Sequence, residues 1–266
     1  MSPGMTLATL VALLPPPLLV AAEERRRDGK EVSQPVQEVF QTELVYPQEK
    51  GEFQLTLSSS WKRVEELRAL EVPLGIEYGI TESWQLSVEW RSLVSVFPPG
   101  KGPVQGIGDL EIATQRSFMS LGRSNFHAAV GLAVGFPTGD SARGLGEGAV
   151  EYEPYLLLAR DFPALGRLQL FGQVAARATS GIQDEGPGVV DRGEAPAVDV
   201  HVGMLLPLRF LVLTTELTGI GSAQKYLLPG MVWLLPGRWE LGVGAALGLT
   251  GASDDFRLLM VTTYEF

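Results

Sequence analysis

Acidic side chains recur at alternate positions of several segments whose intervening residues are apolar. Glu89 lies between Val88 and Trp90, and the same alternation surrounds Glu111. In a β-strand, this spacing places the carboxylates on one face and the apolar side chains on the other. Rings of carboxylates in pores favour cations, so these residues indicate the selection of solutes by charge. The residues expected to line such a lumen are Glu77, Glu89, Arg91, Asp109, Glu111, Glu151, Glu153, Arg177, Asp199, His201, Glu240 and Arg257, and Glu216 also faces inward.

The same charges allow a second interpretation, in which they pair with the inward arginines across neighbouring strands and fill a closed lumen. A barrel of about twelve strands lies between small barrels filled by side chains and open porins, so size does not decide between the two. Glu89, Arg91, Asp109 and Glu111 lie on neighbouring predicted strands and are the best candidates for such a network.

The sequence gives no indication of catalysis. Its two histidines, His127 and His201, have no serine partner in a recognisable motif, and the chain contains no cysteine. The absence of cysteine excludes thiolate chemistry and Cys-based zinc sites. The segment Pro137-Thr138-Gly139-Asp140 has the composition of a turn, and the glycines at 144–148 form a loop because no helix follows them to bind phosphate. We therefore expect no catalytic residues, no metal and no cofactor.

From Gly51 onward, apolar and polar residues alternate with a period of two in about twelve segments separated by turn signals. This pattern predicts half-buried strands. The segment from Trp239 to Thr250 is typical, with large apolar residues on one face and Glu240 and glycines on the other. This pattern is the inverse of a soluble barrel, whose inward face forms a packed core. The predicted fold is all-β: a transmembrane antiparallel up-and-down β-barrel of about 12 strands, with tight turns and longer loops at opposite ends.

Length and charge agree with this fold class. A chain of 266 residues is compatible with one all-β domain. The formal net charge of -10 argues against nucleic acid as a partner, since nucleic acid is bound by clustered Lys and Arg.

The first fifty residues divide into two parts. Residues 1–22 contain an apolar run and end in Val20-Ala21-Ala22, which is typical of a signal peptide cleaved after Ala22. No basic residue precedes the run, and Pro15-Pro16-Pro17 interrupts it. Residues 23–50 are polar and lack sustained periodicity, which predicts a flexible periplasmic segment ahead of a barrel over 51–266.

The last segment ends on an aromatic residue and places Met260, Thr262, Tyr264 and Phe266 on one face. A membrane strand of about 9–11 residues would look like this. We expect this face to contact outer-membrane lipid and to act as the C-terminal signal for the barrel-assembly machinery.

Three short motifs carry a family resemblance: Gly106-Ile107-Gly108-Asp109-Leu110, the strand end Gly131 to Asp140 with its Pro-Thr-Gly-Asp, and Tyr152-Glu153-Pro154-Tyr155-Leu156. With these motifs, residues 51–266 resemble the outer-membrane β-barrel family named for the meta-pathway of phenol degradation. The resemblance implies a single-chain barrel in the bacterial outer membrane, exported through the periplasm, that transports small molecules. It implies no catalytic residues.

The sequence thus favours a channel or transporter for small hydrophobic or cationic solutes. One alternative is a non-conducting structural or assembly barrel with a plugged lumen. A further alternative is an outer-leaflet lipid-modifying enzyme that uses one of the two histidines.

Overall fold

A computed structural model describes residues 24–27, 30–64, 66–122, 125–180 and 197–266. The predicted signal peptide (1–22) and residues 181–196 lie outside the described residues. Two short strands, β1 (Glu24–Arg27) and β2 (Lys30–Ser33), pair with each other outside the barrel. Among the described residues, no helix is long and apolar enough to cross a membrane.

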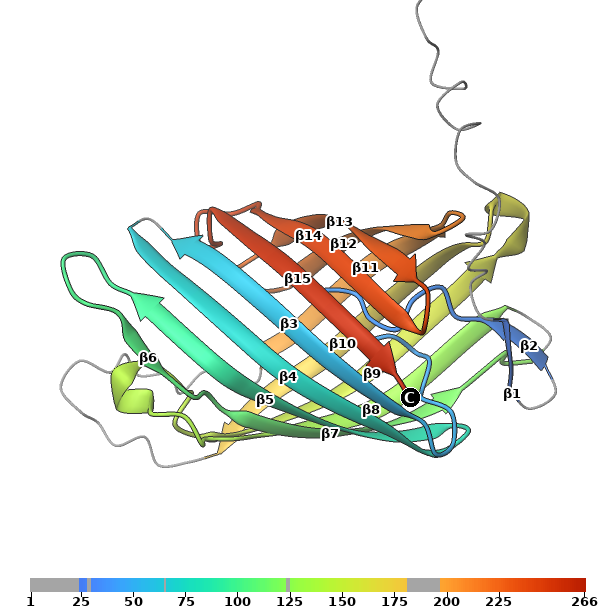
Figure 1. Cartoon of the computed structure of the whole chain (residues 1–266), viewed down its shortest axis with the longest axis horizontal. Helices are drawn as coiled ribbons and strands as arrows, with labels where there is room; N and C mark the ends of the chain where they lie inside the picture. Colours follow the sequence, from blue (N-terminus) through green and yellow to red (C-terminus); the bar gives the residue numbers. More distant parts are fainter. Residues whose placement is uncertain (1–23, 28–29, 65, 123–124, 181–196) are drawn as a thin grey trace, which may run out of the picture.

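Thirteen antiparallel strands form one sheet, and twelve of them close into a barrel, as predicted (Figure 1). The extra strand, β6, pairs only with the end of β5. The strands are β3 (Phe53–Val64), β4 (Leu67–Thr81), β5 (Trp84–Phe97), β6 (Val104–Gly106), β7 (Leu110–Phe118), β8 (Phe126–Phe136), β9 (Val150–Phe162), β10 (Leu168–Ser180), β11 (Ala197–Pro207), β12 (Leu211–Ile220), β13 (Tyr226–Leu235), β14 (Trp239–Gly248) and β15 (Phe256–Glu265).

The last strand closes the barrel against the first. In the β15–β3 ladder, Leu259 faces Ser60 and Glu265 faces Gln54. Beyond the ladder, the Phe266 N–H donates to the Phe53 carbonyl at 2.9 Å, and the Phe53 N–H donates to the Phe266 carbonyl at 3.0 Å. No strand among these twelve is left with a free edge, which is the arrangement that lets a sheet cross lipid.

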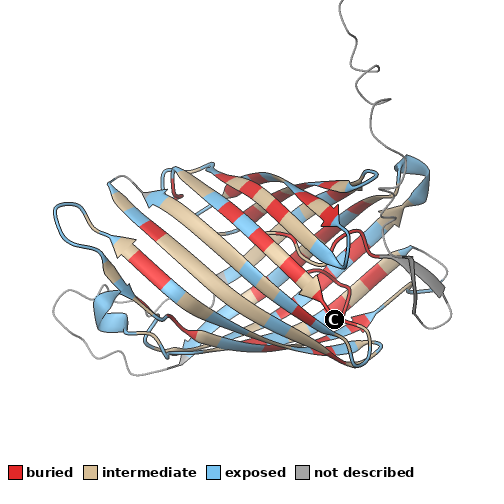
Figure 2. Ribbon diagram, in the orientation of Figure 1, coloured by how far each residue is buried: buried red, intermediate tan, exposed pale blue. Residues whose placement is uncertain are grey.

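The outer wall carries the apolar side chains that the alternation predicts. Leu57, Val130 and Leu170 are 50%, 47% and 44% exposed. In soluble proteins, Leu and Val are among the residues most often fully buried. A continuous exposed apolar wall requires lipid rather than water around it. Figure 2 shows this wall as intermediate and exposed surface interrupted by buried inward positions.

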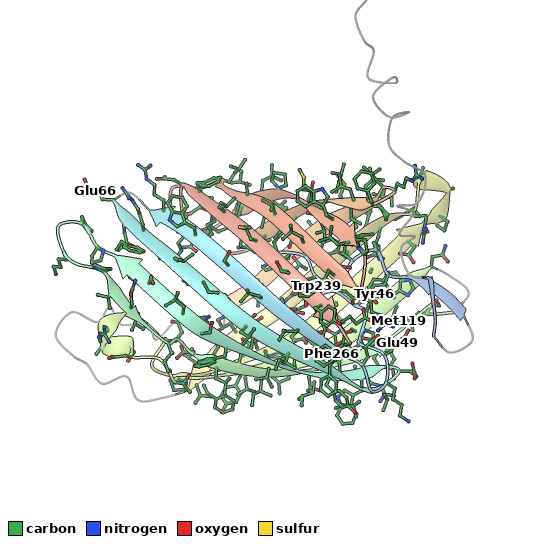
Figure 3. The ribbon with its side chains drawn as sticks, in the orientation of Figure 1. Tyr46, Glu49, Glu66, Met119, Trp239 and Phe266 are labelled. Carbon is green, nitrogen blue, oxygen red and sulfur yellow. The ribbon has the colours of Figure 1, made fainter. Side chains whose placement is uncertain are left out.

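Aromatic rings pack together at both ends of the wall, and at the end opposite the tight turns the ring centroids of Trp61 and Phe256 lie 6.4 Å apart. At the end that carries the tight turns, Trp239 packs on Tyr264 with ring centroids 4.6 Å apart, and Phe266 stacks on Phe53 at 5.6 Å. Figure 3 shows Trp239 and Phe266 at this end and Glu66 at the other. Two aromatic girdles are expected where a barrel meets the two membrane interfaces. Because both chain ends of the barrel lie at the tight-turn end, we call it the periplasmic end.

The N-terminal segment departs from expectation. We predicted a flexible periplasmic stretch over 23–50, but the structure places residues 34–48 inside the periplasmic half of the barrel (Figure 1). Residues 34–48, called the plug below, contain no helix or strand. Val36, Val39, Leu44 and Val45 are all at most 6% exposed. The segment is ordered because its apolar side chains pack on the wall and its main chain finds hydrogen-bond partners there.

The plug closes the periplasmic half of the lumen with an apolar core. Its valines and Leu44 form one cluster with inward residues such as Leu157, Leu205 and Val232, each of which is fully buried. The barrel therefore has a filled periplasmic half, and its remaining internal space lies between the plug and the opposite end.

Candidate functional site

One cavity inside the described barrel, called the main cavity below, has a volume of about 290 Å³ and is lined by both the wall and the plug. Its carboxylates come from Glu77 on β4, Glu89 on β5, Glu111 on β7 and Glu153 on β9, all predicted to line the lumen. Two further predicted residues, Arg177 and His201, are the basic groups of this lining. The strand registers bring these carboxylates close to one another, because Gly75 faces Glu89 and Glu89 faces Glu111 across consecutive ladders.

The plug adds two carboxylates that sequence reasoning did not assign to the lumen, Glu38 and Glu43. Glu43 is exposed to the cavity but enclosed by the barrel, and its main-chain N–H donates to Gln173 Oε1 at 2.9 Å. This enclosure, and then the Glu77 and Glu111 carboxylates, raise the pKa of Glu43 to about 8. Burial followed by Glu77 and Glu43 likewise raises the pKa of Glu38. A positive charge close to such carboxylates would stabilise their ionised form.

Arg177 supplies some of that charge. Its guanidinium pairs with Glu153 at 2.9 Å and with Glu151 in a closer contact. Within the described residues, Glu89 and Glu111 have no ion-pair partner within 4 Å, and the guanidinium of Arg91 lies 3.9 Å from Glu147. The predicted network of Glu89, Arg91, Asp109 and Glu111 therefore does not form as ion pairs, although these four side chains share a smaller cavity of about 30 Å³.

Asp109 has a structural role instead. Its two carboxylate oxygens accept the Gly139 N–H at 2.9 Å and the Glu147 N–H at 2.7 Å, which folds the β8–β9 loop over the barrel wall. Thr138 Oγ1 donates to the Gly108 carbonyl at 3.0 Å in the same contact. Two of the three motifs behind the family resemblance thus meet in space, and their glycines allow the loop backbone to approach the strand closely.

Three other predicted lumen residues lie away from the main cavity. Arg257 pairs with Asp254 and donates to the Tyr226 hydroxyl at 2.9 Å, near the start of β15. Glu240 accepts the Gln37 N–H of the plug at 2.9 Å. Asp199 is on β11 opposite Ala175 and lines neither cavity.

The two histidines have different surroundings. His201 lines the main cavity, whereas His127 is 1% exposed near the periplasmic end. His127 Nδ1 accepts the Ser120 N–H at 2.9 Å, and its Nε2 lies 3.0 Å from Asp161. The plug residue Tyr46 packs beside the His127 ring, with centroids 5.9 Å apart. Both ring nitrogens of His127 therefore have a polar contact, and these contacts hold the ring beside the plug.

Within the described part of the chain, no group of three or more His, Asp or Glu side chains is arranged to hold a metal ion. The cavity carboxylates are spread around the lumen, which suits a diffuse attraction of cations more than a single coordinated ion.

Sequence reasoning missed the plug because its residues show no periodicity. One signal was available: the inward faces of β13 and β14 carry Gly230, Gly242 and Gly244, where a filled barrel needs larger side chains. A Cβ atom at Gly230 would lie 2.3 Å from a ring carbon of Phe40, and one at Gly244 would lie 3.0 Å from the ring. The glycines form a recess for Phe40.

No family model and no curated protein sequence matches the chain. Solved structures do match it. The COG4313 outer membrane channel from Pseudomonas putida F1 is 14% identical, with 84% of this chain and 98% of that chain covered at a TM-score of 0.66. The KdgM porin is 11% identical over 80% of this chain and 99% of its own, at a TM-score of 0.54. The KdgM porin in complex with disordered oligogalacturonate gives 10% identity, the same coverage and the same TM-score.

At these identities the likeness shows the fold, which is that of outer-membrane β-barrels. It does not name the family that the motifs resemble, and that family remains a prediction.

Proposed function

We propose that this protein is an outer-membrane channel for small solutes and that its lumen prefers cations over anions. The observation that carries the proposal is the main cavity, where Glu77, Glu89, Glu111 and Glu153 are joined by the two plug carboxylates. Arg177 and His201 are the only basic side chains in that lining, so the described cavity carries an excess of acidic groups. Such a lining lowers the energy of a cation and raises that of an anion.

The apolar outer wall and the two aromatic girdles support an outer-membrane location. The shared fold with outer-membrane channels supports a channel in general. Oligogalacturonate, named in the KdgM complex, carries carboxylates, so the acidic lining here gives no support for a ligand of that kind.

A specific observation favours one alternative, a non-conducting barrel with a plugged lumen. The plug buries Val36, Val39, Leu44 and Val45 against the wall and fills the periplasmic half. We propose that the plug limits passage in the resting state. The enzymatic alternative gains no support from His127, because both of its ring nitrogens are engaged by Ser120 and Asp161.

Liposome swelling tests the proposal. Proteoliposomes are placed in lysine, glycine or glutamate, three solutes that differ in net charge. We expect the ratio of the lysine rate to the glutamate rate to exceed one, and to fall several-fold in the Glu89→Gln/Glu111→Gln variant because two carboxylates are neutralised. Glu66→Gln, which changes an exposed carboxylate at the far end of the barrel, is the matched control.

Equal lysine and glutamate rates, or a faster glutamate rate, would contradict cation preference. Folded barrels that admit none of the three solutes would instead establish the plugged, non-conducting alternative.

A further inference from the structure

The wall holds the plug through main-chain as well as side-chain contacts. The two carboxylate oxygens of Glu216 accept the Phe40 N–H at 3.1 Å and the Gln41 N–H at 3.2 Å. Glu240 accepts another main-chain N–H at 2.9 Å, from Gln37. Any peptide offers such N–H groups, so this part of the recognition does not depend on the side chains of the plug.

The contacts continue along the rest of the plug in the same manner. Gln85 Oε1 accepts the Gln48 N–H at 2.8 Å, and Gln115 Nε2 donates to the Leu44 carbonyl at 3.0 Å. Glu216 itself is fully buried under the plug. A buried carboxylate is costly without partners, so the wall is built to receive N–H donors at this place.

The Phe40 side chain adds specificity at this place. The Phe40 ring occupies the recess formed by Gly230, Gly242 and Gly244 on two adjacent strands. Glycine weakens a strand and is retained where another group approaches closely. The recess therefore selects a flat ring beside main-chain N–H groups.

We propose that this surface, formed by Glu216, Glu240 and the glycine recess, is a binding site for short peptides that carry an aromatic side chain. The plug is its resident ligand, held in cis. The proposal goes beyond the channel function and does not require conduction. Because a short tether gives the plug an effective concentration of about millimolar, an added peptide binds well only when the resident plug is weakened.

The test uses the full chain with Phe40→Ala/Leu44→Ala, which removes two apolar side chains from the resident plug. The probe is a synthetic fluorescent peptide with the sequence of residues 34–48, and binding to the detergent-solubilised barrel is read by fluorescence anisotropy. We expect the probe to bind this variant at least about tenfold more tightly than it binds the wild type. Heat-modifiable migration on a gel confirms that each variant is folded.

Two matched changes test the recess. A probe peptide with Phe40→Ala should bind the weakened variant at least about tenfold less tightly than the parent peptide. Adding Gly230→Ala to the weakened variant should remove this preference, since the new Cβ would lie 2.3 Å from the ring position. If the two peptides bind the weakened variant equally, or if neither binds, the proposal is wrong.

A second measurement applies if the weakened variant does not fold. A specific protease site is inserted between the exposed residues Lys50 and Gly51 of the wild type and cut after folding. The severed plug should stay bound and then exchange with excess probe peptide. Immediate loss of the severed plug without uptake of probe would overturn the proposal.

These results are independent of the channel proposal. A barrel that binds peptide but never conducts retains this inference and loses the channel. A cation-selective barrel without peptide binding does the reverse.

Discussion

Replacing Asp109 should release the β8–β9 loop while leaving the barrel closed. The carboxylate accepts two main-chain N–H groups, at 2.9 Å from Gly139 and 2.7 Å from Glu147, and the residue is 9% exposed. A hydrogen bond to a charged group contributes about 1.5–3 kcal/mol. Water can solvate the N–H groups once the loop opens, so we take the lower value for each bond. Asp109→Ala then costs about 3 kcal/mol locally, or about a hundredfold in the opening equilibrium.

Limited proteolysis measures that opening. Arg143 is exposed in the short η2 turn (Ser141–Arg143) of this loop and is a trypsin site. Since cleavage follows the open population when opening is fast, the rate at Arg143 should rise about a hundredfold in Asp109→Ala. Asp109→Asn keeps one acceptor oxygen and should give about a tenfold rise. Asp255→Ala, an exposed loop carboxylate at the same end, should change nothing.

An unchanged cleavage rate at Arg143 in Asp109→Ala would refute the reasoning, since it would mean that other contacts hold the loop. Heat-modifiable migration should be preserved, because the strand ladders do not involve the Asp109 side chain.

Two further predictions concern the inside of the barrel. Gly203→Ala places a Cβ atom 2.3 Å from a ring carbon of the buried Phe171, so it should lower the free energy of unfolding by about 1–3 kcal/mol. Urea unfolding measures this, with Gly102→Ala as the control in open space; equal midpoints would contradict it. Enclosure and neighbouring carboxylates raise the pKa of Glu43 above its ordinary value of 4.5 to about 8. The docked plug should therefore lose stability as the pH rises from about 4.5 to 8, and its stability should not change further above pH 8. In a single-cysteine Val39→Cys chain, thiol labelling relative to the same chain with Glu43→Gln should therefore increase over that range, and a constant ratio would count against the sign of the effect.

The barrel could be predicted from the sequence because each strand carries its own signal. Period-two alternation fixes which residues face lipid, and a one-residue error would turn every side chain to the wrong face. Glu77, Glu89, Glu111 and Glu153 all line the main cavity. The short β6 was missed because three residues are too few to show alternation.

The plug could not be predicted in the same way. Its main-chain donors meet wall side chains that are distant in sequence, such as Gln37 with Glu240 and Phe40 with Glu216. Such contacts leave no local period, and a polar, irregular segment is otherwise typical of a flexible chain. Only the inward glycines of β13 and β14 indicated that another segment packs inside the barrel.

Asp109 shows a related limit. Alternation predicts an inward side chain at this position, but the pattern gives no information on which partner a carboxylate binds. The Gly139 and Glu147 N–H groups come after two further strands, β7 and β8, and closure of their loop brings them to Asp109.

The reversal potential of single channels in planar bilayers tests the central claim most directly. The full chain is reconstituted between two KCl solutions of unequal concentration. The account predicts a reversal potential with the sign set by K⁺ flow down its gradient, reduced in Glu89→Gln/Glu111→Gln and unchanged in Glu66→Gln. A potential of the opposite sign, or one that the cavity carboxylates do not affect, would contradict it.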